Sequence, residues 1–339
     1  ILKLTESGYI KPDSSCLISS YCLPFIHIDC IDLSKAKECF LKTTESISSN
    51  NKWPCVNKAT SFAKEFQVSN SYDSYELLVK DPAIDAIYIA TPHSFHKEHT
   101  ILCLQHKKAV LCEKPFAINL KEVAEMIAVA KENKTLLMEA LWTLFLPHYQ
   151  YVINFIKNEV FGKVLLLEAD FGFQSTHSLH SRVLRKELGG GSLLDIGIYP
   201  VFVALSSLGV PKTIEADATF FENGADSACS IVFEYNNAKA ILKSTFLKET
   251  ATEAVFTCEH GIIKINTRFH QPTTVTLIQN GVEKHLDFSA KTFGYNFEIE
   301  HFNQLLRDHK KESELMSFSF SKDLIATLDL IRKKINLNY

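Results

Sequence analysis

Residues 86–93 read Ala-Ile-Tyr-Ile-Ala-Thr-Pro-His, and residues 109–115 read Ala-Val-Leu-Cys-Glu-Lys-Pro. Each stretch is a short apolar run followed directly by polar residues, which predicts a strand buried on both faces of a parallel sheet. Between and after these runs the apolar residues recur at helical spacing, and Asn119 is placed to cap a helix over 120–133. A third buried strand is predicted over 136–138. Strands and helices therefore alternate as in a doubly wound α/β fold.

Further helices are predicted in the first half of the chain. One covers residues 59–66, a second covers 74–80 and ends before Asp81-Pro82, and a third covers 99–106. We expect a doubly wound parallel sheet over residues 1–140, forming the first of two domains.

The second half has a different pattern, in which apolar and polar residues alternate along short segments. Turn signals such as Asn223-Gly224 and Asn280-Gly281 separate these segments. The last 45 residues are predicted to be helical again, over 297–307 and 324–334. Residues 141–339 should form an α+β domain with an open, mostly antiparallel sheet. Its predicted strands are 164–171, 213–221, 227–235, 238–245, 253–258, 261–266 and 275–279.

Composition limits the classes of function. The chain has 339 residues, 46% of them hydrophobic, and 36 basic residues balance 39 acidic ones. This composition supplies a folded core and lacks the basic excess of a general nucleic-acid binder. No apolar run approaches the roughly 20 residues of a membrane helix, so no membrane span is expected. The expected partner is a small molecule.

The nine cysteines are scattered and include no Cys-x-x-Cys pair. This spacing favours buried free thiols over a disulfide framework or a zinc site. We therefore expect a cytoplasmic protein.

The polar residues after the predicted strands are the first candidates for chemistry, because doubly wound folds bind ligands at the carboxyl ends of their strands. Glu113 and Lys114 follow one strand directly, although a surface ion pair explains them equally well. His93, His96 and His99 recur at a spacing of three residues. Because the backbone that carries these histidines is predicted to run from a loop into a helix, no metal site is expected.

Three consecutive glycines, residues 189–191, precede the segment Ser-Leu-Leu-Asp-Ile-Gly-Ile-Tyr. Glycine lets a backbone approach a ligand closely, and a helix beginning here would place Asp195 and Tyr199 on one face. A glycine-rich turn before a core helix explains the glycines alone, but not the polar pair.

These motifs, together with Met138-Glu139-Ala140-Leu141-Trp142-Thr143 and Glu298-Ile299-Glu300-His301-Phe302, resemble the Gfo/Idh/MocA family of nicotinamide-dependent oxidoreductases. The resemblance covers about residues 59–335. Within the family, the chain is most similar to the branch of trans-1,2-dihydrobenzene-1,2-diol dehydrogenase and D-xylose 1-dehydrogenase.

The resemblance implies an N-terminal Rossmann domain, a second domain that often dimerises through its open sheet, and NADP or NAD as cofactor. A homodimer is therefore expected. The resemblance also assigns cofactor contacts on the loop beside the nicotinamide ribose, on the Glu-Lys-Pro motif and on a tryptophan of the nicotinamide pocket. The matching residues are Thr91, Pro92, His93, His96, Glu113, Lys114 and Trp142.

The chemistry of the resembling family requires a base, because hydride leaves an alcohol carbon as its hydroxyl proton is removed. The position of Tyr199 implies that it accepts this proton, with Lys114 lowering its pKa and Asp195 holding the lysine or a substrate hydroxyl. Arg182 and Arg185 precede the glycines and are candidates for binding polar groups of a diol or sugar substrate, although surface arginines are just as ordinary.

The N-terminal sequence departs from the family pattern. Gly8 is the only glycine before residue 162 and is the candidate for the last glycine of the dinucleotide loop. Both divergence and a misjoined gene model explain residues 1–58, and an arginine expected near Ile31 for NADP is missing. The sequence thus predicts an NAD(P)-dependent dehydrogenase. The alternative is a catalytically weak or inactive relative that acts as a ligand-binding regulator.

Overall fold

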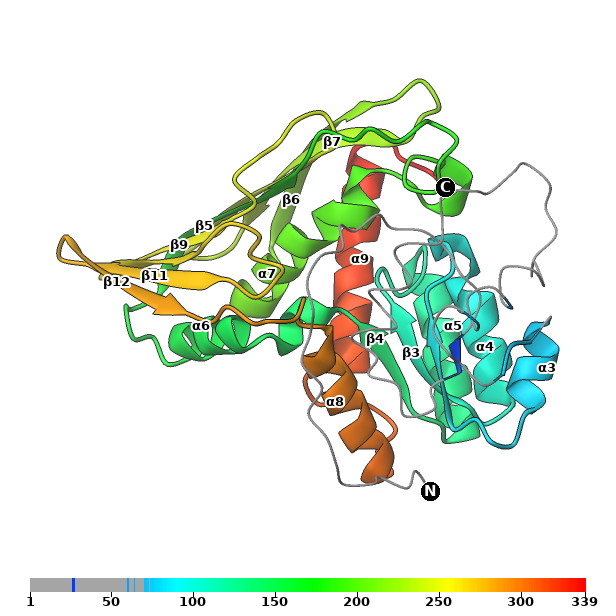
Figure 1. Ribbon diagram of the computed structural model, residues 1–339. Helices are drawn as coiled ribbons and strands as arrows, with labels where there is room; N and C mark the ends of the chain where they lie inside the picture. The colour runs from blue at the N-terminus through cyan, green and yellow to red at the C-terminus, as the bar shows by residue number, and fades with distance from the viewer. Residues whose placement is uncertain (1–25, 28–59, 61–63, 65–69, 73) are drawn as a thin grey trace.

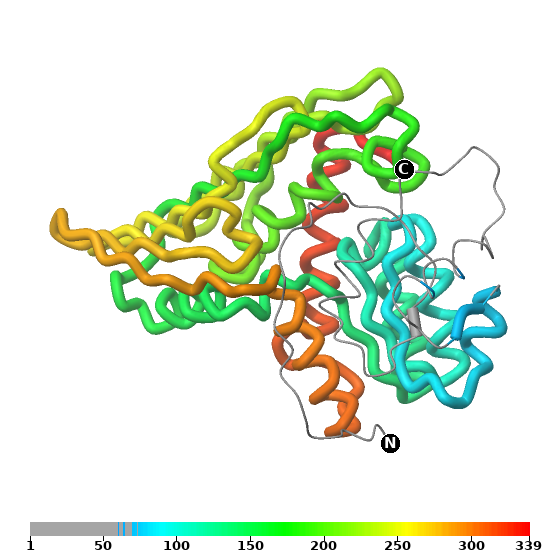
Figure 2. The backbone as a smooth tube through the Cα atoms, in the orientation of Figure 1, coloured from blue at the N-terminus to red at the C-terminus, as the bar shows by residue number. Residues whose placement is uncertain are grey.

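The computed structural model describes residues 26–27, 60, 64, 70–72 and 74–339 (Figure 1). These residues form a small sheet flanked by helices and a large sheet with helices against one face. Figure 2 traces the backbone through both units and shows helix α9 (Phe318–Lys334) standing between them.

The small sheet contains the three parallel strands expected from the sequence. Ile87 of β2 lies opposite Val110 of β3, and Leu111 of β3 lies opposite Met138 of β4. One short strand, β1 (Ile26–His27), pairs antiparallel with β2. The parallel sheet thus carries an antiparallel strand at this edge, as α/β sheets commonly do. The parallel strands are β2 (Ala86–Ile89), β3 (Ala109–Glu113) and β4 (Leu137–Ala140).

Side chains cap two of the helices beside this sheet. The Ser74 hydroxyl accepts a hydrogen bond of 3.2 Å from the backbone N–H of Leu77. Asn119 Oδ1 accepts one of 3.0 Å from the N–H of Glu122, as the sequence predicts. The helices are α3 (Tyr75–Lys80), α4 (His96–Gln105) and α5 (Leu120–Asn133).

The large sheet has eight strands in the order β12-β11-β10-β9-β5-β8-β7-β6. All neighbouring strands are antiparallel except β5 and β8, so the expectation of a mostly antiparallel sheet is confirmed. The strands are β5 (Val164–Gly172), β6 (Thr213–Phe220), β7 (Asp226–Glu234), β8 (Lys239–Thr245), β9 (Ala254–Cys258), β10 (Gly261–Ile265), β11 (Thr274–Gln279) and β12 (Val282–Asp287).

One face of the large sheet packs into the core. Ile231 and Phe233 of β7 are buried, whereas Val232 between them is partly exposed opposite Ile241 of β8. The alternation places every second side chain on the open face. The helices of this unit are α6 (Pro147–Lys157), α7 (Ile198–Leu208), α8 (Tyr295–Arg307) and α9.

Within the described residues, one helical stretch, Lys186–Leu208, is long and apolar enough to cross a membrane. Its most apolar window is 89% buried inside the protein, as expected of a core helix. Its apolar composition follows from its place in the core, because a helix buried on all sides is also apolar on all sides.

All seven strands predicted for the second half are present, within about two residues at each end. The sequence analysis missed helix α6 and strand β12. The side chains of β12 are mostly exposed. Apart from residues 60 and 64, the predicted helix over 59–66 lies outside the described residues, as do Gly8 and the divergent residues 28–58.

Candidate active site

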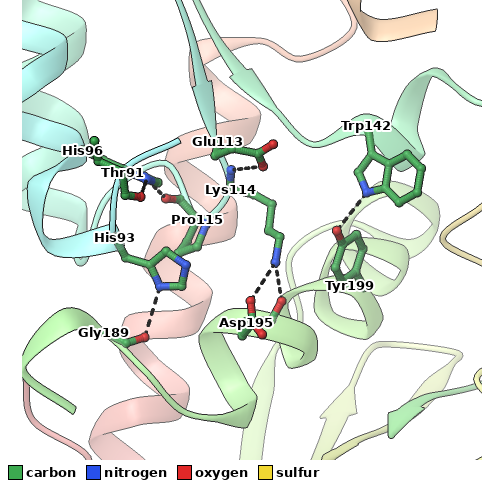
Figure 3. A network of polar contacts seen from close by, with 10 residues as sticks. All are labelled: Thr91, His93, His96, Glu113, Lys114, Pro115, Trp142, Gly189, Asp195 and Tyr199. Carbon is green, nitrogen blue, oxygen red and sulfur yellow. Dashed lines mark hydrogen bonds and ion pairs between the residues drawn. The ribbon is translucent and has the colours of Figure 1, made fainter. Parts of the chain in front are cut away.

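Polar segments meet at the carboxyl edge of the small sheet, because parallel strands all end on the same side. Thr91 and His93 follow β2, Lys114 follows β3 and Trp142 follows β4. The segment that carries Asp195 and Tyr199 faces them from the second unit (Figure 3). The structure therefore brings together residues that are far apart in the sequence.

His96 links the loops that follow β2 and β3. One of its ring nitrogens lies 2.8 Å from the carbonyl oxygen of Thr91, and the other lies 2.9 Å from that of Pro115 (Figure 3). The ring is fully buried, and burial lowers its pKa. Next to it, the Thr91 hydroxyl lies 3.0 Å from His99 Nδ1. His96 and His99 therefore hold the loops that follow β2 and β3 in place.

His93 connects the small sheet to the glycine-rich segment. Its Nδ1 lies 3.1 Å from the carbonyl oxygen of Gly189, which has a φ of +78°. Burial, followed by the positive charge of Arg182, holds the pKa of His93 well below 6.5. The ring is therefore neutral, and Nδ1 donates its proton to the carbonyl oxygen.

Lys114 points across the site to Asp195. Its ammonium lies 3.3 Å from Asp195 Oδ1 and also donates to the backbone carbonyl of the same residue. Burial alone raises the pKa of Asp195, but the charges of Lys114 and Arg182 outweigh it and hold that pKa below its ordinary value. The carboxylate is therefore ionised and fixes the lysine.

Glycine at position 191 leaves room for the buried carboxylate of Asp226, which binds the start of the segment that carries Asp195 and Tyr199. Asp226 Oδ2 accepts hydrogen bonds of 2.7 Å from the Ser192 hydroxyl and 2.6 Å from the N–H of Leu193. A Cβ on Gly191 would lie 2.1 Å from Asp226 Oδ1, and its φ is +136°. The predicted helix begins here with a π-turn, Leu193–Gly197, which continues into α7. This arrangement directs Asp195 toward Lys114.

Tyr199 lies one turn further along, on the predicted face. Its hydroxyl oxygen accepts a hydrogen bond of 2.8 Å from Nε1 of Trp142, and Lys114 Nζ lies 4.9 Å from the centre of its ring. Burial raises the pKa of Tyr199 well above 10, and the hydrogen bond from Trp142 opposes that rise. Burial is thus the largest influence on the pKa of Tyr199, and the Lys114 ammonium beside its ring is directed to Asp195.

Glu113 and Lys114 do not form the ion pair that their sequence suggests. The carboxylate of Glu113 accepts a hydrogen bond from the hydroxyl of Tyr88 and one of 3.2 Å from the backbone N–H of Lys114. The two side chains therefore separate, and the ammonium reaches the second unit.

A cluster of aromatic side chains surrounds Tyr199. The Trp142 ring stacks on Tyr295 with centroids 4.1 Å apart, and Phe171 stacks on His270 at 4.2 Å. The centroid of His270 lies 5.3 Å from that of Tyr199. The sequence analysis missed Phe171, His270 and Tyr295, since no motif marks them and only the fold brings them together.

The two arginine candidates have different positions. The charge of Arg182 acts on Asp195 and His93, so this arginine lies at the site. Arg185 is paired instead with Glu187 at 3.5 Å on the exposed surface. No group of three metal-ligating side chains occurs in the part of the chain that the structure describes.

The residues at this edge fit a nicotinamide dinucleotide. Within the described part of the chain, the Ser94 hydroxyl and Arg182 Nε are buried without a hydrogen-bond partner, so polar atoms at this edge are free to bind. The Thr91–His93 loop, Lys114 and Trp142 would line the nicotinamide end. Gly8, the candidate for the pyrophosphate end, lies outside the described residues.

Comparison with protein families gives two matches. Residues 53–141 match the oxidoreductase family with an NAD-binding Rossmann fold (GFO_IDH_MocA), and residues 149–264 match the GFO/IDH/MocA C-terminal domain. The first match begins after the glycine-poor N-terminal segment.

Several characterised proteins are similar over most of their length. The trans-1,2-dihydrobenzene-1,2-diol dehydrogenase of Xenopus tropicalis is 35% identical over 295 residues, covering 84% of this chain and 88% of that protein. The human enzyme of the same name is 30% identical, and the match covers 84% of this chain and 87% of the human protein. The scyllo-inositol 2-dehydrogenase (NADP(+)) IolU of Bacillus subtilis is also 30% identical, covering 84% and 88%.

Solved structures share the fold at lower sequence identity. KijD10, a 3-ketoreductase from Actinomadura kijaniata in complex with NADP and TDP-benzene, superposes with a TM-score of 0.75 at 22% identity, covering 83% of this chain and 87% of that one. The aldose-aldose oxidoreductase of Caulobacter crescentus, complexed with glycerol, superposes with a TM-score of 0.75 at 19% identity. It likewise covers 83% of this chain and 87% of that one.

Proposed function

We propose that this chain, which belongs to the Gfo/Idh/MocA oxidoreductase family, is an NAD(P)-dependent dehydrogenase of a cyclic diol or a pyranose sugar. The observation that supports this most directly is the meeting of Lys114, Asp195 and Tyr199 at the carboxyl edge of the small sheet. The relatives named for a diol and for an inositol support the substrate class. We place the boundary between the dinucleotide-binding and substrate domains after Ala140, where β4 ends.

In the proposed reaction, Tyr199 accepts the proton of the carbinol oxygen. A bound nicotinamide would accept the hydride that leaves the carbinol carbon. Trp142 Nε1 is a donor and cannot accept, so its hydrogen bond leaves the Tyr199 hydroxyl free to donate toward substrate. The same N–H stabilises the phenolate, which accepts the substrate proton.

Lys114 is proposed to assist by charge and position. Its ammonium is 4.9 Å from the Tyr199 ring centre, where it stabilises the negative charge of a phenolate. Asp195 holds the ammonium in place, and Arg182 adds a second positive charge near that carboxylate. The cofactor contacts assigned to Thr91, Pro92, His93, His96, Glu113 and Trp142 are part of this proposal, as is substrate binding by Arg182 and Arg185.

The scarcity of glycine before residue 162 favours a second candidate function. A side chain in the dinucleotide loop blocks close approach of the pyrophosphate. A chain that binds a sugar or nucleotide without turning it over would then act as a regulator.

We further propose a cytoplasmic homodimer that forms through the open face of the large sheet. Val232 and Ile241 lie opposite each other there, partly exposed, on the face that the helices do not cover. The four described cysteines are free and buried, which fits a reducing compartment. Light scattering should give a dimer mass for the parent protein and a monomer mass for Ile241→Glu.

Titration of the protein with NADPH and NADH, followed by nucleotide fluorescence, tests the proposed function first. A screen of trans-cyclohexane-1,2-diol, D-xylose and scyllo-inositol for NADP reduction completes the test. Micromolar binding together with turnover supports the dehydrogenase. Ligand binding without turnover of any diol or sugar supports the regulator, and absence of any nucleotide binding contradicts the proposed cofactor.

A further inference from the structure

His270 lies beside the proposed acid/base group but has no part in the reaction as derived above. It belongs to the loop between β10 and β11, and its ring stacks on Phe171 with centroids 4.2 Å apart and an interplanar angle of 24°. Its centroid also lies 5.3 Å from that of Tyr199 and 6.0 Å from that of Trp142. The imidazole is therefore part of the cluster of aromatic side chains that surrounds the Tyr199 ring.

The loop that carries His270 is fixed from both sides. The Thr143 hydroxyl donates a hydrogen bond of 3.0 Å to the backbone carbonyl of His270. One residue earlier, the carbonyl oxygen of Phe269 lies 2.9 Å from His148 Nε2. Because both carbonyl groups are held and Phe171 covers one ring face, the imidazole is held in place before any ligand binds.

The ring nitrogen Nδ1 of His270 is a polar atom without a partner. The residue is 6% exposed, and among the described residues none forms a hydrogen bond with Nδ1. A buried polar atom without a partner costs free energy, and a phenylalanine of similar shape would avoid that cost. A bound molecule whose hydroxyl group forms a hydrogen bond with Nδ1 would remove this free-energy cost.

The charge state of His270 limits what it can bind. Burial first, and then the positive charge of Lys114, lowers its pKa to about 3. The imidazole is therefore neutral at physiological pH, so it neither pairs with an anion nor exchanges protons with Tyr199. A neutral imidazole has one donor and one acceptor nitrogen, which suits a hydroxyl group.

We propose that His270 is a specificity-determining residue that binds a hydroxyl other than the reacting one, and so selects a polyhydroxylated ring such as a pyranose or a cyclitol. This inference rests on the proposed function and deepens it by naming a residue of the same site that determines specificity. The aromatic faces of Phe171 and Trp142 accept the apolar C–H face of such a ring. A substrate with fewer hydroxyls leaves the imidazole without a partner and loses this contribution.

The test combines a protein variant with a series of substrates. His270→Phe keeps a flat ring and removes both nitrogens, and His260→Phe, at an exposed turn, is the matched control. The probes are D-xylose and its 2-, 3- and 4-deoxy analogues. We expect His270→Phe to lower kcat/KM for D-xylose about tenfold, and to have no further effect on the one deoxy analogue that lacks the bound hydroxyl.

Calorimetric binding of D-xylose and scyllo-inositol, with and without NADP, separates this inference from the proposed function. Weaker binding of one of these polyols by His270→Phe, partly restored by His270→Asn, supports the role of His270 even if no substrate is oxidised. Equal losses in kcat/KM for D-xylose and all of its deoxy analogues would overturn the proposed role of His270. Failure of the parent protein to bind either polyol would overturn it as well. Thermal unfolding of each variant identifies misfolded protein, and His270→Asn then replaces His270→Phe in the comparison.

Discussion

Nε1 of Trp142 donates a hydrogen bond of 2.8 Å to the hydroxyl oxygen of Tyr199, joining the end of the small sheet to the first turn of α7. Both side chains are buried, so water does not compete for this contact. The bond lowers the pKa of Tyr199 against the larger rise that burial causes. The proton affinity of the proposed base thus depends on a residue from a different element.

Trp142→Phe should therefore move the pH dependence of alcohol oxidation to higher pH. The base is active when deprotonated, and loss of the N–H donor raises the pKa of Tyr199 further. Because the pKa of Tyr199 already lies well above 10 in the parent protein, we expect kcat/KM to fall about tenfold at every pH from about 6 to 9. The measurement is kcat/KM over this range together with a titration of Tyr199 by its tyrosinate absorbance, with Tyr199→Phe as the reference. A loss of kcat/KM with an unchanged titration of Tyr199 would show that the indole only packs.

Tyr199→Phe removes the hydroxyl itself. We expect kcat to fall about a thousandfold, because general acid/base catalysis contributes that order of magnitude, while nucleotide binding persists. Tyr235→Phe is the control, since the Tyr235 hydroxyl makes a surface contact of 3.2 Å with the Gly209 carbonyl. A rate near that of the parent protein would assign the proton transfer to another group.

Lys114→Met should strongly reduce turnover while leaving the protein folded. The variant removes the charge near Tyr199 and leaves the Asp195 carboxylate with Arg182 as its remaining positive neighbour. We expect a loss of about a hundredfold or more in kcat. Lys97→Met, which breaks a surface pair of 3.4 Å with Glu125, controls for the loss of a lysine. Unchanged turnover in Lys114→Met, with an intact thermal transition, rejects the assigned role.

The sequence was sufficient for most of the fold because its elements have local signals. Buried strand β3 is apolar up to its last residue, Glu113, and the strands of the large sheet alternate between apolar and polar residues from one turn to the next. Strand β12 lacks that signal, since Val282 and its neighbours are mostly exposed. The parallel pairing of β5 with β8 has no local signal either, because it joins segments far apart in the chain.

The candidate site was predictable where a motif marked it and not elsewhere. Lys114, Asp195 and Tyr199 follow strand ends or glycines, and the structure brings them together. The direction of the Lys114 side chain was not predictable, because it depends on the position of Asp195 across the site. His270 was missed for a similar reason, since a lone histidine in a loop gains meaning only from Phe171 and Tyr199 beside it.

Glu139 gives a prediction about stability and pH. Its side chain is 2% exposed, Oε1 accepts a hydrogen bond of 3.0 Å from the N–H of Phe116, and burial raises its pKa from 4.5 to about 7. The folded state thus binds this proton more tightly than the unfolded state. Ionisation of Glu139 therefore lowers the free energy of unfolding as the pH rises from 4.5 to about 7.

Glu139→Gln removes this titration and keeps an oxygen for the Phe116 N–H. Relative to the parent protein, the variant should gain stability between pH 4.5 and 7, up to an upper bound of about 3 kcal/mol at pH 8. Urea unfolding at pH 5, 6, 7 and 8 measures the difference. Glu125→Gln, on the surface with its side chain 41% exposed, should show no such trend. A difference between Glu139→Gln and the parent protein that stays constant with pH would mean that the carboxyl does not titrate in this range.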